Sequence, residues 1–143
     1  MKHLLLFLSI LIFSSTASHA QSEIEGITAT LTDYIEGSTG GQPDRLKQAF
    51  YEDLNLYATN KEGEMTIWSG KDYILDTKEG KPTGEDGWIL SIDYENDAAV
   101  AKVKISHPQS KSSYIDYFML LKVKGQWKII HKMYTREVSN KQE

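Results

Sequence analysis

The pattern that most constrains the fold is the alternation of apolar and polar residues in the last third of the chain. Such alternation is typical of β-strands, whose successive side chains point to opposite faces of a sheet. Short turn-forming segments separate four such stretches, residues 88–94, 99–105, 113–122 and 126–136. Connections this short join antiparallel neighbours. We therefore predict an antiparallel sheet, and residues 53–68 show the same period and predict a further hairpin.

The residues before this region follow a helical period instead. One helical face is formed by apolar side chains at Ile24, Ile27, Leu31, Tyr34 and Ile35. Gly37 and the Gly40-Gly41 pair are predicted to end this helix, and Asp44 is the predicted N-cap of a second, shorter one. Ser69 and Asp72 resemble a capping box that starts a third. Helices followed by strands predict an α+β fold, with the helices on the concave side of a strongly curved, mostly antiparallel sheet. Such a sheet encloses a cone with one open end, which is a natural pocket for a small molecule.

The composition excludes several classes of protein. A chain of 143 residues with 40% hydrophobic and 25% charged residues forms one globular domain. The formal net charge of −4 argues against a nucleic-acid-binding protein. The absence of cysteine excludes disulfide bonds, thiolate metal sites and a thiol nucleophile. The two histidines outside the first twenty residues, His107 and His131, lack metal-ligand spacing, so we expect neither a metal site nor a cofactor.

The first twenty residues predict a signal peptide. A short basic start is followed by ten residues, Leu4 to Phe13, of which only Ser9 is polar, and by Ser18-His19-Ala20, which fits a cleavage site. Ten apolar residues are too short to span a bilayer as a helix. We expect cleavage after Ala20 and export of a soluble protein, periplasmic or extracellular, that is not a lipoprotein and does not bind membranes. The domain would then cover residues 21–137, followed by a polar tail at 138–143.

Segments spread over most of the chain carry a family resemblance. They are Asp33–Gly37, Leu46–Phe50, Ile67–Ser69, Ile89–Asp93, Ala98–Val103, Asp116-Tyr117, Leu120–Lys122 and Gly125–Ile130. In order and spacing they resemble the NTF2-like superfamily, in particular its branch named "putative lumazine-binding". The resemblance covers about residues 24–136 and implies the SnoaL-like cone fold. This superfamily includes isomerases, dehydratases, cyclases, hydrolases and non-catalytic dimerisation modules, so the fold does not select a function.

The same resemblance identifies the first candidate site residue, Tyr34. Ketosteroid isomerases of the superfamily carry an oxyanion-stabilising tyrosine sixteen residues before a phenylalanine, and Tyr34 and Phe50 keep this spacing. The position of the isomerase's catalytic aspartate is occupied here by Ala58. Without that base the resemblance does not extend to ketosteroid-isomerase activity. The structural alternative for Tyr34 is a core aromatic residue.

Two further candidates lie on the last two predicted strands. His131 shares its alternation with Trp127, Ile129 and Met133, so we expect it to face the cone as a titratable group. Asp116 lies in an apolar strand and would form a cross-strand ion pair with Lys132 or Arg136, or act as a base. A two-residue turn at Lys124-Gly125 places Asp116 opposite Met133 and diagonal to His131. We expect Tyr57, Trp68 and Tyr117 to line the ligand pocket together with Tyr34 and His131.

Three functions are compatible with this sequence. The first is a small-molecule-binding domain that holds a partly aromatic or apolar ligand in the cone. The second is an enzyme of the cyclase, dehydratase or hydrolase kind that uses His131, Asp116 and Tyr34. The third is a protein-interaction module with a filled cone. In each case the apolar residues on both faces of the strands predict a homodimer formed through the sheet.

Overall fold

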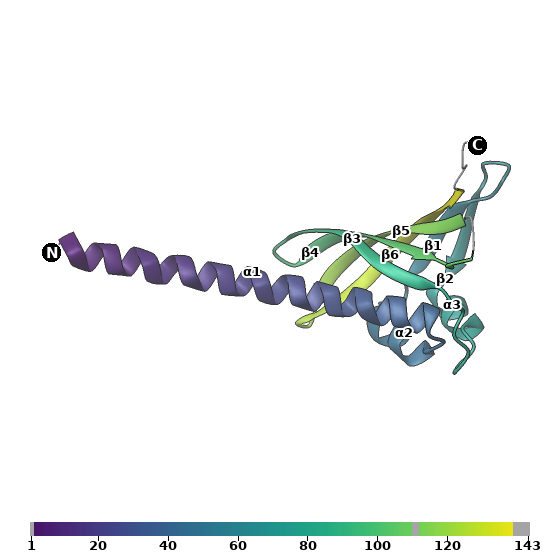
Figure 1. Cartoon of the computed structure of the whole chain (residues 1–143), viewed down its shortest axis with the longest axis horizontal. Coiled ribbons are helices and arrows are strands. Elements are labelled where there is room, and N and C mark those ends of the chain that lie inside the picture. Colours follow the sequence, from purple (N-terminus) through teal and green to yellow (C-terminus); the bar gives the residue numbers. More distant parts are fainter. Residues whose placement is uncertain (1, 110–111, 139–143) are drawn as a thin grey trace.

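The chain folds into three helices and one six-stranded sheet (Figure 1), and the computed structural model describes residues 2–109 and 112–138. The elements are α1 (Lys2–Thr39), α2 (Pro43–Ala49), β1 (Asn55–Thr59), β2 (Met65–Ser69), α3 (Gly70–Asp76), β3 (Asp86–Glu95), β4 (Ala98–Ser106), β5 (Ser112–Val123) and β6 (Gln126–Val138). Their order in the sheet is β2-β1-β6-β5-β4-β3, and every pairing is antiparallel except β1 with β6. The predicted α+β fold with a curved, mostly antiparallel sheet is confirmed.

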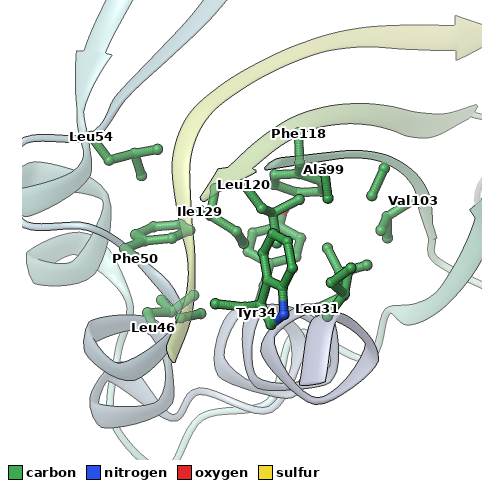
Figure 2. Close-up of a cluster of buried hydrophobic side chains, with 14 of the residues drawn as sticks. Leu31, Tyr34, Leu46, Phe50, Leu54, Ala99, Val103, Phe118, Leu120 and Ile129 are labelled. Carbon is green, nitrogen blue, oxygen red and sulfur yellow. The ribbon is translucent and has the colours of Figure 1, made fainter. Parts of the chain in front are cut away.

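The core lies between α1 and the face of the sheet that we call the inner face. Ile27, Leu31 and Tyr34 are fully or almost fully buried, as the helical period predicts. Figure 1 shows the second half of α1 running along the sheet, with α2 and α3 near one end, and Figure 2 shows Leu31 and Tyr34 on α1 near side chains from the strands. Phe118 and Leu120 meet α1 from the sheet side. Burial of these apolar side chains is the main force that holds helix and sheet together.

The buried part of α1 begins with an acidic side chain. Glu23 is 4% exposed, and its carboxylate accepts hydrogen bonds from Lys122 Nζ at 2.6 and 2.9 Å and from Trp127 Nε1 at 2.9 Å. Gly26 lets the helix approach Trp127, because an added Cβ would lie 3.0 Å from Cδ1 of that ring. These contacts fasten α1 to the strands on either side of the β5–β6 turn. Among the described residues, no helix has both the length and the apolar character that crossing a bilayer requires.

The starts of the short helices differ in how well the sequence predicts them. Ser69 caps α3 as expected. Its Oγ accepts a hydrogen bond from the backbone N–H of Asp72 at 3.0 Å and donates one to the side-chain carboxylate of Asp72 at 2.7 Å. The predicted N-cap at Asp44 is wrong, because α2 begins at Pro43 with Gln42 in the capping position. Proline is favoured in the first turn of a helix, where its missing N–H would be unpaired in any case.

The loop between α3 and β3 is held by the turn between α1 and α2. The backbone N–H of Gly80 donates to the carbonyl of Gly41 at 2.9 Å, and that of Thr83 donates to the carbonyl of Thr39 at 2.8 Å. Gly41 has φ +65, and a Cβ there would lie 2.7 Å from the carbonyl oxygens of Lys78 and Lys81. The approach of the loop therefore depends on glycine at this position.

A β-bulge in β6 changes the face on which its second half projects. Leu120 pairs with Ile129 as the two-residue turn predicts, but the register shifts next to this pair, and Met119 pairs with His131. The extra residue, Ile130, reverses the alternation of all residues that follow it in β6. Asp116 consequently pairs with Tyr134. The expectation that it lies opposite Met133 and diagonal to His131 is wrong.

Candidate functional site

A pocket of about 190 Å³ opens at the end of the core where α1, α3 and the strands converge. It is walled mainly by aromatic side chains with a small set of polar groups. Its lining residues are Tyr34, Ser38, Leu56, Trp68, Tyr73, Glu85, Ile105, Tyr114, Asp116, Lys132 and Tyr134. Apolar walls with a few convergent polar groups are typical of small-molecule sites.

Three polar side chains are buried together where α1 meets the two central strands. The hydroxyl of Tyr34 donates to Oδ2 of Asp116 at 2.6 Å, and Nζ of Lys132 donates to the Tyr34 oxygen at 2.5 Å. Lys132 Nζ also lies 3.2 Å from the same carboxylate oxygen. The side chains of Lys132 and Asp116 are only 5% and 1% exposed. We call Tyr34, Asp116 and Lys132 the buried triad. The predicted cross-strand ion pair of Asp116 is confirmed, with Lys132 as the partner.

Aromatic rings surround the ammonium group of Lys132. Its Nζ lies between 4.7 and 5.9 Å from the ring centroids of four residues, Tyr34, Tyr73, Tyr134 and Phe118. The negative faces of aromatic rings attract a cation at such distances. The rings and the carboxylate together therefore stabilise a positive charge inside the core, where an isolated ammonium group would be very unfavourable.

The electrostatics of the triad keep Tyr34 protonated. Burial raises the pKa of the Tyr34 phenol well above its ordinary value, and the neighbouring Tyr73 and Asp116 raise it further. Tyr34 therefore acts as a hydrogen-bond donor and not as a phenolate. Oδ1 of Asp116 is buried and has no hydrogen-bond partner among the residues that the structure describes. Such an atom in a native fold requires an explanation, because a buried acceptor without a donor costs about 1–3 kcal/mol.

A second cleft adjoins the pocket. It has a volume of about 360 Å³ and shares Ser38, Trp68, Tyr73 and Glu85 with the pocket. Its other walls come from α3 and the loop that follows, including Lys78 and Lys81. Trp68 and Tyr73 pack edge to face with their ring centroids 5.2 Å apart, and they stand on the boundary between the two spaces. A ligand larger than the pocket could extend past these rings into the cleft.

The structure brings only part of the predicted site together. Tyr34, Asp116 and Trp68 line the pocket as expected, whereas Tyr57, Tyr117 and His131 do not. His131 stacks on Tyr57 with the ring centroids 4.5 Å apart, on the opposite, outer face of the sheet. Its predicted orientation is wrong because of the bulge at Ile130. Tyr117 lies beneath the ammonium group of Lys102 on the same outer face.

Sequence reasoning named Lys132 only as a partner for Asp116 and missed Tyr73, Tyr114 and Tyr134 as lining residues. The bulge at Ile130 brings Lys132 to the inner face of the sheet, beside Asp116. A lysine within cross-strand reach of an aspartate that lies in an apolar strand is the signal that the sequence offers. Within the described parts of the chain, no group of three or more His, Asp or Glu side chains could hold a metal ion.

The outer face of the sheet is largely apolar. Met119 and Met133 are 51% and 53% exposed, and other large apolar side chains surround them. Pairing places these residues on the outer face together with Met65, Ile67, Val100, Tyr117 and Leu121. Three of the four methionines of the chain therefore share one exposed surface. A contiguous patch of this kind marks an interaction surface in a folded protein.

Known families and structures agree with this architecture. Residues 22–135 match the family described as "Putative lumazine-binding". No curated protein matches the sequence. Among solved structures, an NTF2-like protein of unknown function from Shewanella baltica OS155 is 24% identical, with a TM-score of 0.71 over 82% of this chain and 96% of that chain. One from Silicibacter pomeroyi DSS-3 is 21% identical, with a TM-score of 0.70 over 82% and 98% of the two chains.

A third NTF2-like protein of unknown function, from Methylobacillus flagellatus KT, is 24% identical with a TM-score of 0.70, over 82% of this chain and 94% of that chain. At this identity these similarities establish the fold alone. The family match covers most of the sequence, including the whole of the pocket. The chain therefore belongs to the "putative lumazine-binding" family and has the NTF2-like fold.

Proposed function

We propose that this protein is an exported domain that binds a small, planar molecule in the pocket above the buried triad. The observation that carries the proposal is a balanced ion pair, Lys132 with Asp116, placed at an aromatic-walled pocket. Replacing a buried ion pair by apolar residues is often neutral or stabilising, so stability alone does not require one here. The description of the family, which names a heteroaromatic compound, supports the same class of ligand.

Binding is better supported than catalysis by the residues in the pocket. Of the three proposed catalytic residues only Tyr34 and Asp116 line it, and His131 lies on the other face of the sheet. Tyr34 retains its proton because its pKa is raised, and Asp116 is engaged with Lys132. General acid–base catalysis needs a group that exchanges protons near the working pH. The pocket residues are arranged instead as fixed hydrogen-bond donors and acceptors.

Export is the second part of the proposal. The fold is fastened at Glu23, three residues after the predicted cleavage site, through hydrogen bonds to Lys122 and Trp127. Figure 1 shows the first half of α1 projecting beyond the sheet. Cleavage after Ala20 would therefore leave a domain of residues 21–137 with its buried contacts intact. Mass spectrometry of the exported protein should find Gln21 as the first residue, and a full-length product retained in the membrane would contradict export.

The third part of the proposal is a homodimer formed through the outer face. A two-fold axis would bring the apolar patch around Met119 and Met133 onto itself in an isologous interface. Met119→Glu would place two charges in that interface and should yield a monomer, whereas Glu25→Gln on the exposed surface of α1 should not. Light scattering at micromolar concentration measures both. A monomer mass for the unchanged protein would contradict the dimer.

A titration with small planar molecules tests the proposed binding site. Spectra of ¹⁵N-labelled protein should show saturable shifts of the Trp68 indole N–H and of backbone amides of β5 and β6 at the pocket. His131→Ala alters only the outer face, so the dissociation constants should stay unchanged. Shifts confined to the outer face, or a loss of binding in His131→Ala, would contradict the proposed site.

A further inference from the structure

In the buried triad, an N–H of Lys132 and Oδ1 of Asp116 have no hydrogen-bond partner among the described residues, and these two groups limit which ligands fit. An ammonium group has three N–H donors, and the structure gives Lys132 one hydrogen bond, to the Tyr34 oxygen, and an ion pair with Oδ2 of Asp116 at 3.2 Å. The carboxylate has two oxygens, and Oδ1 has no donor among the described residues. Both side chains line the pocket. The unused N–H and the unused oxygen therefore belong to neighbouring groups at one site.

The charge of the triad favours a neutral ligand. Lys132 and Asp116 form a pair 3.2 Å apart with no net charge, and Tyr34 remains neutral. The remaining ionisable lining groups are three tyrosines and Glu85, which lies on the boundary with the second cleft. An anion would have no further cation to pair with and would be repelled by Asp116 and Glu85. A cation would be repelled by Lys132, which already pairs with Asp116, and only Glu85, at the boundary with the second cleft, would attract it among the lining residues. Either would lose its hydration without compensation.

Size and wall chemistry limit the ligand further. An apolar cavity of about 150 Å³ can hold one benzene molecule, and the pocket measures about 190 Å³. It therefore accepts one six-membered ring with small substituents. Trp68, Tyr114 and Tyr134 present aromatic surfaces that favour a flat ring. Any larger substituent would extend into the second cleft.

We infer that the pocket binds a cyclic amide, a flat neutral ring whose carbonyl accepts from Lys132 and whose adjacent N–H donates to Oδ1 of Asp116. This inference rests on the proposed function and specifies its ligand class. A lactam or cyclic urea places its donor and acceptor side by side on one edge, as the triad does. Reaching Oδ1 requires a small movement of the surrounding side chains, because that atom is buried in the free protein.

A series of one-ring probes of similar size tests the inference. 2-Pyridone presents the carbonyl and the N–H, N-methyl-2-pyridone lacks the N–H, toluene lacks both, and benzoate adds a negative charge. Each lost hydrogen bond to a charged group should weaken binding about 10–150-fold, so the order of affinity should be 2-pyridone, N-methyl-2-pyridone, toluene. Benzoate should bind more weakly than 2-pyridone. Dissociation constants come from titrations that follow the Trp68 indole signal.

The outcomes separate the inference from the proposed function. If toluene or benzoate binds as tightly as 2-pyridone in the pocket, the cyclic-amide inference is wrong and the pocket still binds planar molecules. If none of the four probes causes saturable shifts at the pocket, the proposed function fails as well. Lys132→Met/Asp116→Leu removes the donor and the acceptor together and should abolish the preference for 2-pyridone over toluene. Lys102→Met, the matched change on the outer face, should preserve that preference.

Discussion

Substitution of Lys132 by methionine should destabilise the protein more than any other lysine substitution on the sheet. The change keeps an unbranched side chain as long as the lysine stem but removes the cation from a pair whose members are 5% and 1% exposed. Asp116 would then be a buried carboxylate whose one remaining hydrogen bond, among the residues that the structure describes, comes from the hydroxyl of Tyr34. Breaking a buried ion pair in this way costs about 3–5 kcal/mol, a large share of the roughly 5–15 kcal/mol that stabilises a native domain.

Urea unfolding followed by tryptophan fluorescence measures this loss. Lys102→Met, on the outer face, should change the free energy of unfolding by less than about 0.5 kcal/mol. Lys132→Met/Asp116→Asn should recover more than half of the loss, since it removes the unpaired charge and retains an acceptor for Tyr34. If Lys132→Met is no more destabilising than Lys102→Met, or if the double variant is less stable than Lys132→Met, the ion pair does not have the role we assign to it.

Three further changes test other parts of the structure. Burial raises the pKa of Tyr34. The contribution of the protonated phenol to stability is therefore full below about pH 10, the ordinary pKa of tyrosine, and declines above it by up to about 1.4 kcal/mol per pH unit. Tyr34→Phe should reduce this alkaline decline of the free energy of unfolding in urea, and an equal decline in both proteins would contradict the assignment. Gly87→Ala places a Cβ 2.4 Å from Ile35 Cγ2 and should lower the free energy of unfolding by about 1–3 kcal/mol through overpacking. An unchanged melting temperature would show that α1 can move away from the sheet at this point. Glu23→Gln weakens the hydrogen bonds to Lys122 and Trp127 and should cost about 1–3 kcal/mol, whereas the exposed Glu25→Gln should have little effect on the melting curve.

The fold could be predicted because local patterns and the overall architecture agree. The helical period of Ile27, Leu31 and Tyr34 places these residues on one buried face, and the structure buries all three. The alternation in β4 assigns its faces correctly, since Ala99, Ala101, Val103 and Ile105 are buried, and short turns give the antiparallel order. Each of these signals is local, since it depends on a few neighbouring residues.

The site could be predicted only in part, because one inserted residue changes it. Ile130 is apolar and β-branched and resembles an ordinary strand residue, so nothing in its type reveals the bulge. The bulge moves His131 to the outer face and brings Lys132 into the core beside Asp116. A pairing register is a property of two strands, and the sequence of one strand does not contain it.

The aromatic lining was missed for a related reason. Tyr73 comes from α3, whereas Tyr114 and Tyr134 come from β5 and β6, so the three rings are far apart in the sequence. Tyr73 is linked to α1 through a 2.5 Å hydrogen bond between its hydroxyl and Oγ of Ser38. This contact depends on where α3 lies in space relative to α1. The predicted hairpin and capping box show that a helix follows β2, but they do not determine that position.

The most direct test of the account is a crystal structure of the protein soaked with 2-pyridone. We predict a single ring in the pocket near Trp68 and Tyr134, with its carbonyl within hydrogen-bond distance of Lys132 Nζ and its N–H directed at Oδ1 of Asp116. A ring bound on the outer face beside His131 would contradict the account. So would an empty pocket in which a neighbouring side chain already donates to Oδ1 of Asp116.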